Sequence, residues 1–470
     1  MKPRKHLPQE ELFPFVAMEK LIPEGHILRL IDRHVNFSFI DELVDHTYSE
    51  ITGRPATDPE LMVRILTIGY LYNLSESRLF EELRMHAAYR WFCNLGFNDP
   101  TPDRSTMNRL RNHRWSRDGI FERIMQNVVK QCVIAGLVSG KHVTVDGTKI
   151  RANASIKSLE PIVVEVELDE YLDRLDLKSP PKLAGDTSSD DKDFRSEKLS
   201  NDTHRSTTDP DARLYKKASG QEAALSYVGS YLIDTKSRVI LSTSVTQPGI
   251  ATEIDAAREM LDSLDASGLL PMVETLAADK GYGATEFVTE LVDRGIMPHI
   301  PLLSQPVMEP IPTWKTTTTI PEKQKKRDEK VKQALTRNFV RFLAQTCSYR
   351  KSQKQRKRIE HLFAEAKVCH GLGRARCRGL RALLEQLAMT AFVQNIKRLV
   401  RFSRRCISNV SALSPESVTK SLVPQGFTRL FFVHDLLHFF GIVHRSFINQ
   451  FRIFSLESIH FVYHPLSQDF

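Results

Sequence analysis

The sequence of 470 residues has few cysteines and no long apolar run. Its six cysteines include no CxxC pair, which argues against a zinc ribbon or a disulfide framework and favours a reducing compartment. No stretch reaches the ~18 uncharged apolar residues that span a bilayer, and the first residues, MKPRKHLPQEELFPF, lack the apolar region of a signal peptide. We therefore expect a cytoplasmic protein, of two or three domains at this length.

Charge of one sign is only slightly in excess, since 66 Lys and Arg against 57 Asp and Glu leave a net charge of +9. The basic residues crowd between positions 323 and 405, in runs such as KQKKRDEKVK and RKSQKQRKR. Such clusters fit a polyanion because Lys and Arg displace counterions from phosphates. For any one cluster taken alone, a solvated helix face is the commoner explanation.

Residues 15–115 have the pattern of short helices in close succession. The clearest start is at Asp58 and Pro59, where the aspartate can cap free backbone N–H groups and the proline can occupy the first helical position. The last of these helices displays arginines, which resembles the second helix of a helix-turn-helix module in a DNA groove. A helical bundle with a basic surface fits equally well. The candidate DNA-binding residues here are Arg104, Arg109 and Arg111.

Strand patterns begin near residue 141. In HVTVDGTKI the alternation predicts a strand that carries Asp146 near its end, beside Gly147. The segments LSYVGSYLI and RVILSTSV predict two paired strands, and after a helix the strand ETLAA ends at Asp279. Three successive strands, then helix and strand in alternation, predict an α/β domain with a mixed sheet.

The predicted domains are 1–120, helical, and 121–405, α/β, with a C-terminal extension at 406–470. The α/β domain includes an insertion at 176–221, rich in Ser, Asp, Lys and Pro, after a helix expected near Val163, and a basic segment at 304–358. The extension holds ten of the 25 phenylalanines, in an order that suits neither a helix nor a strand. An oligomerisation or membrane-surface element is one explanation, and a poorly selected extension from an altered reading frame is the favoured one.

Three acidic residues carry the predicted chemistry. Asp146 and Asp279 each end a strand beside a glycine, where open α/β sheets place their ligands, although such an aspartate is often only a turn residue. In RKRIEHLFAEAK, Glu360 shares a helical stripe with Arg356 and Lys367, and without the two aspartates a surface ion-pair ladder would explain it. Together the carboxylates suit two Mg²⁺ ions ~4 Å apart, which can activate an attacking oxygen and relieve a leaving oxygen of charge.

The motifs resemble those of the DDE transposases of bacterial insertion sequences, in the insertion-sequence-four and insertion-sequence-five-like group. The resemblance runs from about Phe13 to Leu399. It implies a ribonuclease-H-like catalytic domain behind a helical domain, with strand cleavage at transposon ends and transfer of the 3′ hydroxyl into target DNA. The matching segments are GRPATDPELMVRIL, PTPDRSTMNRLR, VDGT, TDPDARL, AADKGY, R-x3-E-x6-K, HGLGRARCRGL and LEQLAMTAFVQNIKRL.

By this resemblance Asp146, Asp279 and Glu360 form the catalytic, metal-binding triad, with Mg²⁺ as cofactor and Mn²⁺ able to substitute. The resemblance also implies a homodimer on paired terminal inverted repeats of double-stranded DNA, associated with the bacterial nucleoid. Neither a membrane nor a small-molecule substrate is expected. The DNA-contacting residues would include, besides the arginines named above, Arg356, Lys367, Arg374, Arg376 and Arg378.

The chain departs from the family pattern at one position of the glutamate motif. The pattern Y-x2-R-x3-E-x6-K has tyrosine where this chain has Gln353, and the nearest tyrosine is Tyr349. Among cysteines, the segment 304–349 contains only Cys347, so no structural zinc is expected.

Two other functions fit the residues: a ribonuclease-H-like nuclease without strand transfer, and a catalytically inactive remnant that only binds DNA.

Overall fold

The computed structural model consists of a helical first part and a mixed sheet with flanking helices. The helix expected near residue 163, most of the expected insertion and the aromatic extension lie outside the described residues. Within the described part of the chain, no helix is long and apolar enough to cross a membrane. The described ranges are 18–48, 56–115, 119–162, 199–216, 222–303, 307–313 and 321–411.

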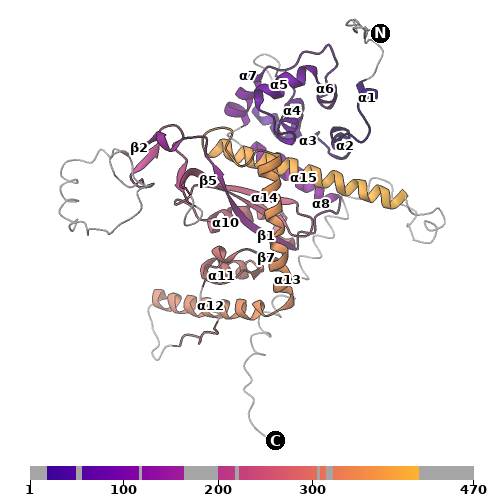
Figure 1. Cartoon of the computed structure of the whole chain (residues 1–470). Helices are drawn as coiled ribbons and strands as arrows, with labels where there is room; N and C mark the ends of the chain where they lie inside the picture. The colour runs from indigo at the N-terminus through magenta and orange to yellow at the C-terminus, as the bar shows by residue number, and fades with distance from the viewer. Residues whose placement is uncertain are drawn as a thin grey trace, which may run out of the picture. The chain divides into compact units, whose positions relative to one another are not determined.

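The first part of the chain is helical, as its helix-capping residues and prolines predict (Figure 1). Asp58 caps α4 by accepting a hydrogen bond of 2.9 Å from the backbone N–H of Glu60, and Pro59 is the first helical residue. Ser75 caps α5. The helices are α1 (Met18–Leu21), α2 (Ile27–His34), α3 (Phe39–Val44), α4 (Pro59–Leu71), α5 (Glu76–Met85), α6 (Ala87–Phe92), α7 (Arg104–Arg109), the π-helix Leu110–Trp115 and α8 (Ile120–Ile134).

A mixed sheet forms the centre of the second part. Strand β1 (His142–Arg151) pairs antiparallel with β5 (Ala224–Asp234) and parallel with β7 (Thr275–Ala277). Strand β6 (Ile240–Thr246) and β4 (Arg213–Tyr215) pair antiparallel with β5, and β8 (Met297–His299) pairs parallel with β7. The six strands, antiparallel on one side of β1 and parallel on the other, form the predicted mixed sheet. A separate small sheet pairs β2 (Leu159–Pro161) with β3 (His204–Ser206).

Helices cover both faces of the sheet. Tyr231 of β5 lies opposite Asp146 in register and stacks on Phe363 of α14 (Arg358–Cys369), with ring centroids 4.7 Å apart. The space beside Gly147, the next residue of β1, is filled by a side chain of α10 (Glu253–Ala266). Successive residues of a strand point to opposite faces, so α10 and α14 lie on opposite sides of the sheet.

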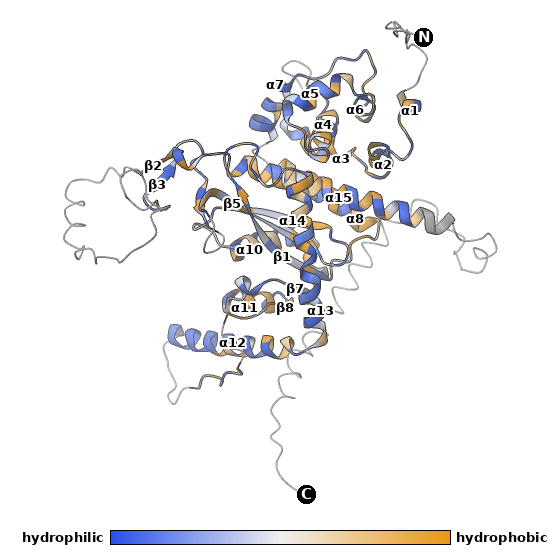
Figure 2. Ribbon diagram, viewed as in Figure 1, coloured by the Kyte–Doolittle hydropathy of each residue, from blue (hydrophilic) through white to orange (hydrophobic). Residues whose placement is uncertain are grey.

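The remaining helices follow the sheet in the sequence and differ in character. Figure 2 shows α12 and α13 as largely hydrophilic ribbons, whereas α15 carries apolar residues along much of its length. The basic residues of the predicted segment 304–358 therefore lie mainly on two helices. These helices are α11 (Thr285–Asp293), α12 (Pro321–Ala344), α13 (Cys347–Arg356) and α15 (Leu380–Ser411).

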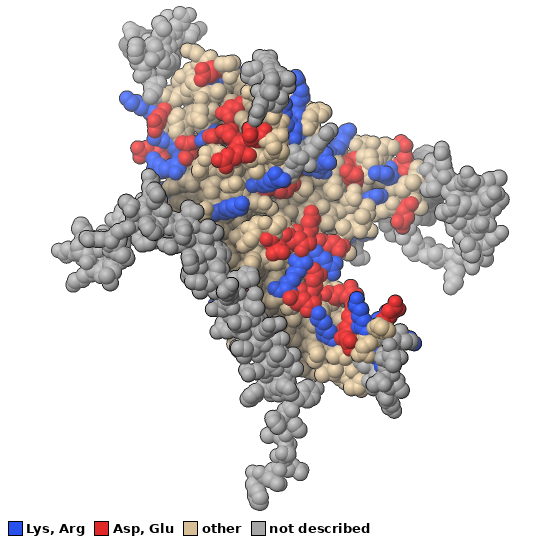
Figure 3. Space-filling model, turned by 180° about the vertical axis from the view of Figure 1, so that it is seen from behind, with Lys and Arg blue, Asp and Glu red and all other residues tan. Residues whose placement is uncertain are grey.

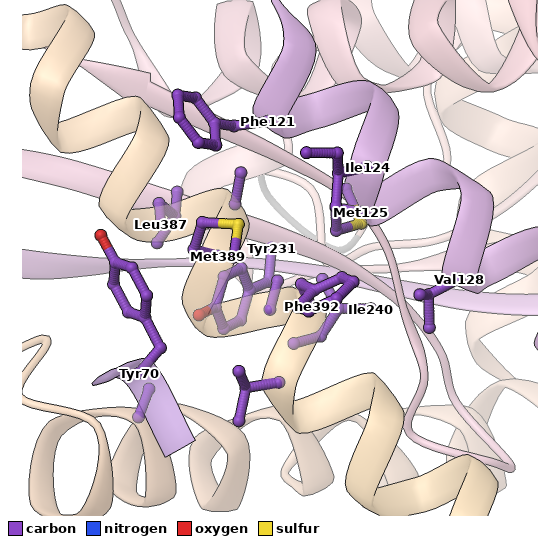
Figure 4. Packing of buried hydrophobic residues seen from close by; sticks show 14 of the residues in the cluster. Tyr70, Phe121, Ile124, Met125, Val128, Tyr231, Ile240, Leu387, Met389 and Phe392 are labelled. Atoms are coloured by element: carbon purple, nitrogen blue, oxygen red, sulfur yellow. The ribbon is translucent and has the colours of Figure 1, made fainter. Parts of the chain in front are cut away.

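One apolar core joins the N-terminal helices to the sheet domain. Tyr70 of α4 belongs to the same cluster as Phe392 of α15 and Ile240 of β6 (Figure 4). The imidazole Nδ1 of His370 lies 2.8 Å from the carbonyl oxygen of Tyr70, a second link between the two parts. The core is thus continuous across the boundary predicted near residue 120.

Candidate active site at two adjacent strands

The sheet brings Asp146 and Asp279 to neighbouring positions. In the parallel pairing of β1 and β7, Thr144 lies opposite Ala277. Asp146 lies two residues after Thr144, and Asp279 lies two residues after Ala277. Paired strands run about 4.8 Å apart. The predicted convergence of the two aspartates is therefore a consequence of strand order and register. We refer to Asp146 and Asp279 as the acid pair.

Both carboxylates of the acid pair are fixed by the backbone beside them. The Oδ1 atom of Asp146 accepts a hydrogen bond of 2.9 Å from the N–H of Gly147. The Oδ1 atom of Asp279 accepts one of 2.8 Å from the N–H of Gly281, and Asp279 caps the short 3-10 helix η6 (Lys280–Tyr282). Both residues are partly exposed, so each carboxylate can be reached from solvent.

Arg356 supplies positive charge at the acid pair. Its guanidinium NH1 lies 3.7 Å from Oδ2 of Asp146, and both side chains are 18% exposed. The Nε atom of Arg356 is buried and has no hydrogen-bond partner among the described residues. An arginine with donors to spare beside carboxylates can bind a phosphate group that approaches them.

Glu360 lies on the first turn of α14. Residues before and after Glu360 hold this part of the chain next to the acid pair. Arg356 precedes Glu360 and contacts Asp146, while Phe363 follows it and stacks on Tyr231, the residue opposite Asp146 in β5. The side chain of Glu360 itself is exposed. The prediction of one helical stripe that joins Glu360 to Arg356 and Lys367 was wrong for Arg356, because α13 ends at Arg356 and α14 begins at Arg358.

The three predicted metal ligands do not form a closed cluster. Among the described residues, no three carboxylate, imidazole or thiolate side chains are grouped closely enough to hold a metal ion. Carboxylates repel one another, and a cation that all of them bind supplies the free energy for bringing them together. The assignment of Glu360 as the third ligand stays a prediction.

Gln353, which replaces the tyrosine of the family pattern, joins α13 to the ends of β7 and β8. Its side-chain Nε2 donates hydrogen bonds to the carbonyl oxygen of Ala278, at 3.2 Å, and to that of His299. Both carbonyls belong to buried residues. This amide therefore holds the helix that carries Arg356 against the strand from which Asp279 extends.

We expect Gln353→Ala to lower the free energy of unfolding by about 1–2 kcal/mol, because two buried carbonyl groups lose their donor. Urea denaturation followed by circular dichroism measures this loss. Gln355→Ala, two residues along the same helix, serves as the control and should change the stability by less than about 0.5 kcal/mol. Equal losses in the two variants would contradict the role given to Gln353.

The predicted DNA-contacting residues differ in accessibility. Arg104, Arg109, Arg374 and Arg378 are exposed, whereas Arg356, Lys367 and Arg376 are partly buried. Acidic and basic side chains are mixed on the face shown in Figure 3, which carries no single positive field. Their contacts with DNA stay predictions.

Arg376 and Arg111 make internal contacts that link distant parts of the chain. Arg376 donates to the side-chain Oδ1 of Asn73 at 2.9 Å, and its guanidinium lies over the ring of Tyr70. Arg111, only 7% exposed, donates to Glu385 at 2.6 Å and also to Glu76. Arg111 is thus the one buried member of the predicted set, and it joins the helical part of the chain to α15.

The TDPDARL segment anchors the start of α15. The Oδ1 atom of buried Asp209 accepts hydrogen bonds from the Tyr227 hydroxyl at 2.7 Å and from the Gly379 N–H at 3.1 Å. Oδ2 of Asp211 accepts from the N–H of Leu380, the first residue of α15, at 3.1 Å. A sequence motif that matched the family therefore has a structural function here, beside any function in the reaction.

Glu253 and Tyr282 are two further residues near the acid pair, and sequence reasoning did not single them out. Tyr282 is fully buried, and burial together with the negative charges of Glu253, Asp146 and Asp279 raises its pKa well above its ordinary value. Tyr282 is part of the AADKGY motif, but nothing in the sequence indicated that its ring is buried. For Glu253 the only signal was its place at the start of a helix, beside the capping residue Thr252.

Comparison with known proteins agrees with this site. Residues 16–113 match a family described as "Transposase domain (DUF772)", and residues 202–396 match a family described as "Transposase DDE domain". A transposase DDE domain is an enzyme domain that acts on DNA and generally uses a divalent metal. The chain belongs to the DDE transposases and is a DNA transposase, and the insertion-sequence subgroup stays a prediction.

Two solved structures are weakly similar. One is the cryo-EM structure of a piggyBac transposase synaptic complex with hairpin DNA, at 10% identity over 86% of each chain with a TM-score of 0.28. The other is the crystal structure of a pre-cleavage Mos1 transpososome, at 10% identity over 66% of this chain and 82% of the other, with a TM-score of 0.17. At these scores the family matches alone carry the assignment.

Proposed function

We propose that this transposase hydrolyses one DNA strand at each end of its element and then joins the freed 3′ hydroxyl to a phosphodiester of target DNA. The observation that supports this proposal most is the acid pair on two adjacent parallel strands, with Arg356 beside it. A carboxylate pair next to a guanidinium suits a phosphodiester, because the arginine can hold the phosphate while the carboxylates bind cations.

The proposed metal ligands are Asp146 and Asp279, with Glu360 as the predicted third. Their donor atoms are carboxylate oxygens, which fit Mg²⁺ or Mn²⁺ better than a soft metal. When bound, such ions supply charge stabilisation for both the attacking and the leaving oxygen. The acid pair orients the ions through the fixed positions of its carboxylates, and no nucleophilic side chain is needed.

The chain's own cations have separate roles in this proposal. Arg356 holds the phosphate at the acid pair, and Lys367, about two turns after Glu360 on α14, follows the DNA backbone. Arg374 and Arg378 contact DNA from the exposed loop before α15. We propose double-stranded DNA carrying terminal inverted repeats as the partner, and a homodimer that holds the two ends together.

The proposal is tested by incubating the full chain with a DNA fragment that carries its coding region and flanks, a target plasmid and Mg²⁺ or Mn²⁺. We expect nicks at the element's ends and then joined products. Cleavage without joined products would identify a nuclease, and sequence-specific binding without cleavage would identify an inactive remnant. Either result would overturn the proposed two-step reaction.

Arg378→Ala should weaken DNA binding at every sequence tested, because a phosphate contact carries no base information. The slope of log Kd against log salt concentration should fall by about 1 for one lost contact. Arg378→Lys keeps the charge and should keep the slope. A slope unchanged in Arg378→Ala would remove this residue from the DNA-binding set.

A further inference from the structure

Glu253 is fixed next to the acid pair by the first turn of α10. Thr252 caps this helix, and a capping box links its backbone and side chain to those of Asp255. Glu253 is the first residue of the helix, where the positive end of the helix dipole favours a carboxylate. The helix packs on β1 and on η6, the elements that carry Asp146 and follow Asp279.

The Glu253 carboxylate reaches β1 through the space left by Gly147. A Cβ atom added at Gly147 would lie 3.2 Å from Oε1 of Glu253 and 3.1 Å from Cγ1 of Val228, closer than ordinary van der Waals contact. Gly147 follows Asp146 directly in the chain. The glycine of the VDGT motif thus admits the Glu253 carboxylate against β1, at the residue that follows Asp146.

Tyr282 gives a second, independent sign of a ligand site at this place. Its side chain is fully buried, and its hydroxyl has no hydrogen-bond partner among the described residues. The hydroxyl lies within the electrostatic influence of Glu253, Asp146 and Asp279, and of Arg356 as the opposing positive charge. A buried hydroxyl is normally hydrogen-bonded, so Tyr282 has a donor available for a group bound near these carboxylates.

We propose that Glu253 is a further metal-binding carboxylate of the active site, which holds a divalent cation together with Asp146 and Asp279. The proposal rests on the proposed function, because it takes the acid pair as the centre of the metal site. Glu253 approaches from α10 on one face of the sheet and Glu360 from α14 on the other, so the two glutamates are not equivalent. When the cation is bound, Tyr282 would donate a hydrogen bond from its hydroxyl to one of these carboxylates.

Mn²⁺ titration of the purified, metal-free full chain, followed by electron paramagnetic resonance, tests the proposal without an activity assay. We expect Glu253→Gln to raise the Mn²⁺ Kd about tenfold or more, since a charged ligand is lost. Asp265→Asn is the matched control, because it removes a carboxylate from the same helix about 18 Å along its axis. Its Kd should equal that of the parent.

The outcomes separate the two proposals. A Kd for Glu253→Gln equal to that of Asp265→Asn, with Asp146→Asn strongly weakened, overturns the role of Glu253 and leaves the acid pair in place. Unchanged binding in Asp146→Asn overturns the metal site of the proposed function itself. Thermal unfolding of each metal-free variant shows whether it is folded, and Glu253→Asp, which retains a carboxylate, should bind Mn²⁺ more tightly than Glu253→Gln.

Gly147→Ala tests the same inference without altering any ligand. The added methyl group should displace the Glu253 carboxylate and weaken Mn²⁺ binding, as the loss of that ligand does. Gly373→Ala is the control, because an added Cβ there meets nothing within 4 Å. Equal Mn²⁺ affinity in the two alanine variants would contradict the placement of Glu253 at the metal site.

Discussion

Asp146→Asn and Asp279→Asn should each lose strand cleavage of end-containing DNA by about three orders of magnitude or more. Each substitution keeps the side-chain shape but removes a charged ligand, and metal stabilisation of the transition state amounts to several kcal/mol, at 1.36 kcal/mol per tenfold in rate. Single-turnover cleavage in Mg²⁺, followed on sequencing gels, measures the loss.

The control for these variants is Glu286→Gln, which neutralises a carboxylate in the first turn of α11. It should cleave at the parent rate. The two asparagine variants should also bind end DNA at least as tightly as the parent, since less negative charge faces the phosphate. Cleavage by Asp279→Asn within tenfold of the parent would remove that residue from the catalytic assignment.

The second large effect is expected at the ion pair between Arg111 and Glu385. The two side chains are 9% and 8% exposed, and burial raises the pKa of the Glu385 carboxyl although Arg111 lies beside it. Glu385→Leu leaves the buried guanidinium with only Glu76, so we expect the free energy of unfolding to fall by about 3 kcal/mol. Urea denaturation at neutral pH measures the change.

The double variant Arg111→Met, Glu385→Leu distinguishes a lost partner from a damaged core. The double variant replaces both charged side chains by apolar ones. Such an exchange of a buried ion pair often leaves the free energy of unfolding unchanged or raises it. We therefore expect the double variant to recover most of the stability lost by Glu385→Leu. A double variant as unstable as the single one would show that packing around Leu at position 385 causes the loss.

The order of the elements was predictable because it depends on local patterns. Asp58 and Pro59 predicted the start of α4, and the alternation around Asp146 predicted β1. The order of strands in the sheet depends on pairing between distant segments, which no local pattern specifies. The sequence could therefore predict a mixed sheet, while the placement of β1 between β5 and β7 came from the structure.

The acid pair was predictable in part. Asp279 follows the end of β7 as predicted, whereas the prediction of a strand end at Asp146 was wrong, because β1 continues through the pairing with β5 to Arg151. Glu253 was not predictable, because a glutamate at the start of a helix is common and its neighbours come from strands far away in the sequence. For the arginines, the sequence could not distinguish a surface residue from a buried one. Arg104 and Arg111 have the same pattern in the sequence, yet the first is 59% exposed in its side chain and the second is buried against α15.

The most direct test of the central claim is a crystal structure of the chain with Mn²⁺ and a short end-containing duplex, with anomalous scattering recorded at the manganese edge. The account predicts an anomalous peak bound by carboxylate oxygens of both Asp146 and Asp279, next to a phosphate. A peak bound by other residues, with the acid pair outside its coordination sphere, would contradict it.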